Sequence, residues 1–361
     1  MRRLTGFPLL LGSLLLLTVG TSQRLAAQDD ARVRELIREG IALHDKKMYD
    51  EALEKYQEAQ AIDSTNPTLL YEMGFTCSAM GDDRKSLEIA LLGTTLDSPL
   101  RGAFYMMVGT AYDHLGKPEK AVDAYEEGIE RMPDDGMLRY NLAVTYVGMS
   151  EPEKAIETVQ AGLLRNSEHA SSHLLLGALF ADTGERIPSL FAMMRFLILE
   201  PNSARTAPIL GKLHNVLTSG VTSKETTEEG GMEINISLSG MESEEGDFMV
   251  IDMMLGLTLA SLLTDSLYAD AATVEKMGHV LDRIFTMLGE TKSGKRGFTA
   301  DYYAPFFIAL NKEGHTEAFT YYISFSDDEP EIAAWFANDE NEEKVTEFLE
   351  WVEEYEWAAE E

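Results

Sequence analysis

Cysteine is almost missing from this sequence, since Cys77 is the only one among 361 residues. A chain with one cysteine cannot form an internal disulfide, so its folding must rest on packing alone. We predict that Cys77 is a small buried residue on a helix rather than a reactive thiol.

Basic side chains are also scarce. Lysine and arginine number 30 against 62 acidic residues, which gives a formal net charge of −32. A field of this sign repels nucleic acid and anionic lipid head groups, so both are poor partners, and we expect no nucleic acid to bind. It suits a cationic partner, and it also keeps a protein soluble. The chain is 45% hydrophobic and can therefore fill a core.

Long apolar runs are missing except at the N-terminus. Phe7 to Val19 is apolar, Arg2 and Arg3 precede it, and small residues follow. This layout is typical of a secretory signal peptide, so we expect residues 1–27 to be removed after Ser22 or Ala27 and the protein to reach the periplasm or the outside of the cell. A later run from Met249 carries Asp252 and predicts a buried helix, with no stable membrane insertion.

Catalytic motifs are missing as well. The stretch GETKSGKR resembles a phosphate-binding loop, but Arg296 stands where a hydroxyl should hold magnesium, and a helical pattern precedes it. His169 and His173 have the spacing of metal ligands, but with no third ligand nearby we predict a surface pair. We expect no enzyme, no cofactor and no metal. A hydrolase whose residues are scattered in the sequence is the remaining catalytic hypothesis.

An internal repeat is present. Small residues recur at spacings of 34, 35, 34 and 34 residues, at Gly40, Gly74, Gly109, Ala143 and Gly177. A second set follows each by about twelve residues, at Ala52, Ser86, Ala121, Ala155 and Ser189. Small side chains let two helices approach closely, so each unit is predicted to be a pair of antiparallel helices.

The repeated segment resembles tetratricopeptide repeats, for example in MVGTAYDHLGKPEKAVDAYEEGIERMP. Five units run from about Val33 to Pro201, with a partial sixth that ends near Gly220, so we predict a repeat domain over residues 28–219. The resemblance implies a right-handed superhelix with a concave, peptide-binding face. In register, the residues that line this face are Tyr71, Phe75, Met106, Met107, Thr110, His114, Tyr140, Asn141, Val144 and Leu174.

This predicted groove is apolar and aromatic. The subset of the family that clamps a C-terminal carboxylate needs lysine, arginine and asparagine at these places, and only Asn141 fits, so we expect a different occupant.

The composition changes after residue 219. Residues 220–247 predict a polar loop with one short β-strand, because MEINISLS alternates apolar and polar residues. Residues 248–361 predict an acidic helical domain with an aromatic core and helices near 248–266, 271–288, 300–312, 316–324, 330–337 and 342–358. The segment around DYYAPFF resembles the end of exported bacterial repeat proteins of unknown function.

The predicted fold class is therefore mostly α, a helical solenoid followed by a smaller helical domain. The predicted function is a non-catalytic scaffold that binds a protein or peptide, cationic or apolar, in the bacterial cell envelope. The alternative is a structural or assembly protein whose groove is filled by its own C-terminal half. The sequence leaves the oligomeric state open.

Overall fold

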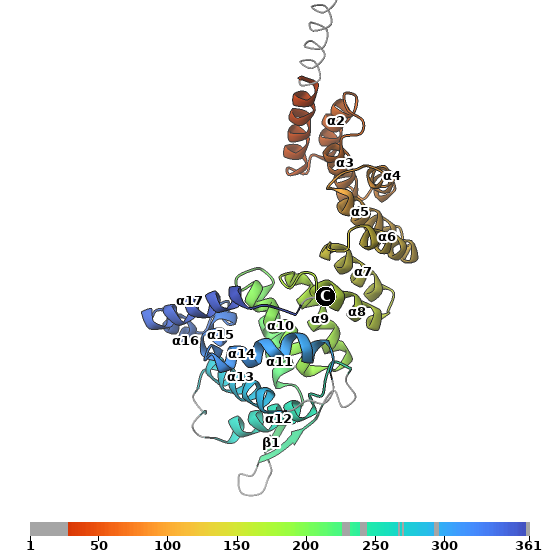
Figure 1. Ribbon diagram of the computed structural model, residues 1–361. Coiled ribbons are helices and arrows are strands. Elements are labelled where there is room, and N and C mark those ends of the chain that lie inside the picture. The colour runs from red at the N-terminus through yellow and green to blue at the C-terminus, as the bar shows by residue number, and fades with distance from the viewer. Residues whose placement is uncertain are drawn as a thin grey trace, which may run out of the picture. The chain divides into compact units, whose positions relative to one another are not determined.

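The computed structural model describes residues 28–225, 232–238, 244–265, 268, 271–291 and 296–358 (Figure 1). The predicted signal peptide, residues 1–27, lies outside them. The chain forms two compact units, one that ends at Ser150 and one that begins at Glu151, and each is described by itself. Both are mostly helical, and the described residues include one two-stranded antiparallel sheet, which confirms the predicted fold class.

The first unit is a series of helices joined by short turns, and each helix packs against the next. Its helices are residues 28–44, α2 (Tyr49–Gln60), α3 (Pro67–Ala79), α4 (Asp83–Thr94), α5 (Arg101–His114), α6 (Pro118–Arg131) and α7 (Gly136–Gly148).

Local sequence explains where these helices begin and end. α3 has proline at its first position, and the side chain of Asn66 accepts a hydrogen bond from the Leu69 amide at 3.2 Å. Gly81 and Gly116 follow α3 and α5 with φ of +79° and +68°, a left-handed conformation that glycine adopts without strain.

The recurring small residues pack as predicted. A Cβ atom added to Gly109 would lie 2.4 Å from the ring of Tyr125, and one added to Gly40 would lie 2.2 Å from the ring of Tyr56. The two tyrosines are buried at the same place in two repeats. Cys77 is buried in the same core as Tyr56, as predicted, and burial raises the pKa of its thiol.

The second unit is built around α10. Every residue of this helix from Arg186 to Ile198 is buried, as in a helix covered on all sides. Among the described elements, α9, α11, α12, η2 and α15 contact it. The helices of this unit are α8 (Pro152–Leu163), α9 (Ala170–Thr183), α10 (Arg186–Leu199), α11 (Thr206–Thr218), α12 (Met249–Thr264), α13 (Thr273–Glu290), the π-helix η2 (Thr299–Tyr303), α14 (Ala304–Lys312), α15 (Thr316–Ile323), α16 (Pro330–Phe336) and α17 (Asp339–Glu354).

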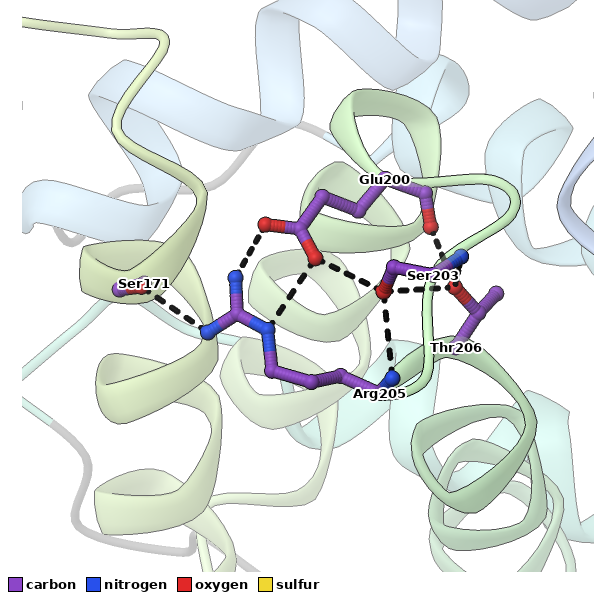
Figure 2. A network of polar contacts seen from close by, with 5 residues as sticks. All are labelled: Ser171, Glu200, Ser203, Arg205 and Thr206. Carbon is purple, nitrogen blue, oxygen red and sulfur yellow. Dashed lines mark hydrogen bonds and ion pairs between the residues drawn. The ribbon is translucent and has the colours of Figure 1, made fainter. Parts of the chain in front are cut away.

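The turn from α10 to α11 is fixed by polar contacts (Figure 2). The Arg205 guanidinium donates to the carboxylate of Glu200 through two nitrogens, and its Nη1 donates to Ser171 Oγ on α9 at 2.9 Å. Thr206 Oγ1 donates to the Glu200 carbonyl at 2.8 Å. The network joins the end of α10, the start of α11 and α9.

The C-terminal helices lie where the sequence predicts them. The aromatic core predicted for this segment is present: Tyr302, Tyr303, Phe306, Phe307 and Phe319 are buried, and Tyr322 is half-buried. In the part of the chain that the structure describes, no helix is long and apolar enough to cross a bilayer.

The predicted strand is confirmed, and its partner is a second strand that precedes it in the chain. β2 (Met232–Ile236) pairs antiparallel with β1 (Val221–Glu225), which lies in the segment predicted as a polar loop. β1 has one apolar residue, Val221, so its pattern gives no strand signal, and backbone pairing with β2 defines it. On β2, Ile236 packs against Gly256 of α12.

The division into two units falls inside the segment predicted as one repeat domain. It follows from packing, because α10 shares a core with α12, η2 and α15. The domain boundaries predicted from the sequence, 28–219, 220–247 and 248–361, stay predictions.

Candidate peptide-binding surface

The first helices of successive repeats form one surface in the first unit. α3 contacts α5, and α5 contacts α7. We call the side that carries the exposed side chains of residues 28–44, α3, α5 and α7 the first-helix surface. Nine of the ten residues predicted to line a groove lie on these helices.

Aromatic rings dominate the part of this surface on α3. Phe75 is 47% exposed, and its ring stacks on Tyr71, with centroids 6.1 Å apart. On its other side it stacks on His44, with centroids 5.0 Å apart. Exposed large aromatic rings in a row offer a flat apolar contact for a partner side chain.

Three of the four predicted residues on α5 are at least partly exposed. Met106 and Thr110 are half-buried and His114 is exposed. Met107 is 8% exposed, and a Cβ atom added to Gly74 would lie 2.4 Å from its sulfur, so it belongs to the core between α3 and α5 and does not line the surface. Gly74 has no side chain, so the long flexible side chain of Met107 on α5 fills the space beside it.

On α7 all three predicted residues reach the surface. Val144 is 43% exposed, and Tyr140 and Asn141 are half-buried. The side-chain amide of Asn141 donates to the Met137 carbonyl one turn earlier, at 2.8 Å. The tenth predicted residue, Leu174, lies on α9 in the second unit, so the first-helix surface as defined does not include it.

The carboxylates near this surface were not predicted from the sequence. Burial raises the pKa of Glu72, and the neighbouring charge of Asp45 raises it further. Burial also raises the pKa of Asp113, against the hydrogen bond that Thr145 Oγ1 donates to it at 2.6 Å. Among the described residues, no lysine or arginine forms an ion pair with Asp45, Glu72 or Asp113. The raised pKa values of Glu72 and Asp113 mean that the charges of these two carboxylates lack full compensation from water or a cation.

The spacing of the repeats contained a signal for one of these positions. His44 and Asp113 both follow the small residue of their repeat by four positions, and each contacts a threonine 32 residues later. His44 Nδ1 lies 2.8 Å from Thr76 Oγ1, which is the counterpart of the contact between Asp113 and Thr145. In these two repeats, the residue at the end of the first helix therefore contacts the first helix of the next repeat.

The prediction that His169 and His173 form a surface pair is wrong for His173. Its ring is fully buried, with Nδ1 2.6 Å from the hydroxyl of Tyr303 and Nε2 2.9 Å from the Ser167 carbonyl. Burial lowers the pKa of His173 to about 3, so the ring is neutral, accepts from Tyr303 and donates to Ser167. The C-terminal segment thus packs on α9 within the second unit.

The described residues contain no group of three or more histidine, cysteine or acidic side chains placed to hold a metal ion. α13 ends at Glu290 within the GETKSGKR stretch, as predicted, and residues 292–295 of that stretch lie outside the described residues.

Comparison with known proteins adds two relatives from fungi. The chain is 27% identical over 118 residues to the small glutamine-rich tetratricopeptide repeat-containing protein 2 of Mycosarcoma maydis, which covers 33% of each chain. It is 33% identical over 98 residues to the heat-shock protein cognate co-chaperone sgt12 of Aspergillus fumigatus, which covers 27% of this chain and 28% of that one. The match therefore spans about a third of these relatives.

Among solved structures, a thermophilic TPR protein of Thermus thermophilus is 19% identical, with a TM-score of 0.42 over 51% of this chain and 98% of that one. Residues 40–81 match the family described as TPR repeat, and residues 103–135 match the family described as tetratricopeptide repeat. Both matched segments lie in the first unit; the first contains α2 and α3, and the second contains α6 and most of α5.

Proposed function

We propose that this chain is a protein-binding scaffold that holds an extended segment of a partner on the first-helix surface. The observation that carries the proposal is the aromatic row of exposed Phe75 and half-buried His44 and Tyr71, on a segment that matches the TPR repeat family. An apolar side chain of the partner would pack on Phe75, as anchor residues do in other protein interfaces. No chemical step is needed for such a role.

The partner segment would carry basic residues beside its apolar ones. Glu72 lies on α3 beside Tyr71, Asp45 follows His44, and Asp113 lies near the end of α5 against α7. A lysine or arginine of the partner would supply the cation that these carboxylates lack among the described residues. None of the ten predicted lining residues is itself basic apart from His114, and His114 Nδ1 lies 2.9 Å from Asp83 Oδ1.

The name of the Aspergillus relative makes a chaperone segment one candidate partner for this chain. The charge of the surface favours a basic segment over an acidic one, because acidic residues would meet Glu72 and Asp113. An acidic peptide is therefore the informative comparison in a binding experiment.

The test uses two synthetic peptides with the same apolar residues, one flanked by lysines and the other by glutamates. Fluorescence anisotropy should give a micromolar Kd for the lysine peptide, about −8 kcal/mol, and at least tenfold weaker binding for the glutamate peptide. Phe75→Ala should weaken both peptides, whereas Leu91→Ala, which removes a similarly exposed apolar side chain from α4, should weaken neither.

Two further variants separate charge from apolar contact. Glu72→Gln and Asp113→Asn should weaken only the lysine peptide, and Asp113→Asn still accepts the hydrogen bond from Thr145. Equal binding of both peptides would contradict the preference for a basic segment but would leave binding at the first-helix surface standing. Unchanged capture by the Phe75→Ala variant, in cells that carry a photo-crosslinking amino acid at position 140, would rule out the surface itself.

We also propose that the protein acts in the bacterial cell envelope. The support is the sequence of residues 1–27, with two arginines before a short apolar run. Expression in a Gram-negative host followed by N-terminal sequencing should find a mature chain in the periplasm that begins near residue 23 or 28. A full-length chain that stays in the cytoplasm would contradict this location.

A further inference from the structure

The second unit contains an apolar cavity of about 340 Å³ that is separate from the first-helix surface. Its volume lies at the lower end of the range for small-molecule sites, about 300–1,000 Å³. The described residues that line it come from α11, β1, α12 and α13.

Each helix contributes one stripe of side chains to the cavity. α12 supplies Leu259, Leu262 and Leu263, which share one helix face because they are three and four residues apart. Met277 and Val280 of α13 and Leu217 of α11 form buried walls. Leu263 is 49% exposed at this site, a large apolar side chain without full cover.

Three nitrogen-bearing side chains, His214, Asn215 and Lys276, interrupt the apolar lining, and two of them can be charged. Lys276 lies on the stripe of α13 that also carries Met277 and Val280, and residues one turn away from it on that helix are not acidic. It forms no ion pair with any described residue. His214 presents a buried Nε2 that has no hydrogen-bond partner in the described part of the chain.

The charges around the cavity distinguish the possible head groups. No carboxylate is among its described lining residues, although the chain as a whole is strongly acidic. Asp327 and Glu329 act on His214 from the segment before α16, but burial is the larger effect and lowers the pKa of His214, so that ring is neutral near pH 7. Lys276 is then the cation that faces the cavity, and an amine on a ligand would be repelled by it.

We propose that this cavity binds a fatty-acid-like ligand, with its alkyl chain between α12 and α13 and its carboxylate on Lys276. The apolar walls remove the alkyl chain from water, and Lys276 supplies the positive charge that pairs with the head group. This site does not depend on the peptide-binding proposal, since its residues lie in the other unit.

The experiment is calorimetric titration of the full chain with decanoate below its micelle concentration. Affinity should fall roughly fourfold for each methylene removed in the series from decanoate to octanoate, because each buried methylene contributes a similar increment. Lys276→Met should weaken decanoate at least tenfold and leave decanol within twofold. Lys212→Met, which removes an exposed lysine of α11 outside the cavity, should change neither.

Three results would overturn the proposal. The first is the absence of binding by both decanoate and decanol. The second is decylamine binding as tightly as decanoate, which would show that Lys276 does not select the head group. The third is unchanged decanoate binding in a Leu263→Trp variant of normal helicity, whose indole would fill the cavity, since the ligand would then bind elsewhere.

Discussion

At the scale of single residues, close packing of the helices in a repeat depends on glycine, which has no Cβ atom. Gly109 lies under the ring of Tyr125, and the buried ring cannot move aside as the end of a flexible side chain could. The Tyr125 hydroxyl is also held 3.1 Å from Thr110 Oγ1. Close packing at this joint therefore requires glycine.

Gly109→Ala should lower the free energy of unfolding of the first unit by about 1–3 kcal/mol, because the methyl group overpacks the joint. Urea unfolding followed by circular dichroism measures the change. Gly148→Ala is the matched control: it lies at the end of α7 with open space around it, and the better helix propensity of alanine should leave stability equal or higher by up to about 1 kcal/mol. Equal effects of both substitutions would contradict the packing argument.

His173 makes stability depend on pH. Its pKa in the folded protein is lowered to about 3, so the unfolded chain takes up a proton near pH 6.5 while the folded chain does not. The contribution is fully present above about pH 6.5 and is lost as the pH falls toward 3, by roughly 1.4 kcal/mol per pH unit. In NMR spectra of the folded protein, the His173 ring signals should not titrate between pH 7 and 5. A midpoint near 6.5 would show that the ring is accessible and unpaired.

At the scale of elements, one buried ion pair joins α10 to α12. Arg186 Nε donates to Asp252 Oδ1 at 2.5 Å, and both side chains are buried. The same guanidinium donates to the carbonyls of Asp252 and of Ser219, so it also ties in the end of α11. Asp252, which interrupts the apolar run that begins at Met249, is therefore the partner of buried Arg186.

Asp252→Ala should destabilise the second unit by about 3–5 kcal/mol, because it leaves the buried guanidinium without its counter-charge. Thermal unfolding followed by tryptophan fluorescence measures this, since all three tryptophans lie at or after residue 335. Glu317→Ala breaks an ion pair of 2.8 Å with Lys344 that is exposed, and it should cost about 1 kcal/mol or less. A comparable loss in both variants would show that burial does not govern the contribution of Asp252.

Sequence patterns predicted the elements well where periodicity is strong. The ranges 271–288 and 316–324 correspond to α13 and α15, because their apolar residues recur at helical spacing. The pattern failed for β1, whose polar side chains leave only backbone pairing to define it. It also failed for contacts across long separations: Tyr303 meets His173 from 130 residues away, and local spacing contains no information about such a pair.

At the scale of the whole molecule, charge is unevenly distributed along the chain. Residues 220–361 carry eight basic and 32 acidic side chains, a net of −24, and α17 has acidic residues throughout with no basic residue in its last turn. Charge of one sign opposes the compact state. Salt should therefore stabilise the protein.

Raising the salt concentration from 10 mM to 150 mM shortens the screening length from about 30 Å to about 8 Å and should raise the Tm. Glu343→Lys and Glu347→Lys on the exposed side of α17 should reduce this dependence, since they remove part of the repulsion. Differential scanning calorimetry at two salt concentrations gives both results. A Tm that falls with added salt would indicate that attractive pairs outweigh the net charge.

The candidate surface was predicted in outline because the repeat register places its aromatic and apolar residues. Its carboxylates were not predicted, because Glu72 and Asp113 acquire their importance from burial and from neighbours on other repeats. Met107 was misplaced for the same reason: the space that it fills is created by Gly74 on another helix.

The burial of Cys77 has a practical consequence. Because the native chain shields its sole sulfhydryl, a cysteine introduced at exposed Val144 would be the one position open to maleimide dyes or spin labels. Such a label would report on occupancy of the repeats without any need to replace Cys77 first.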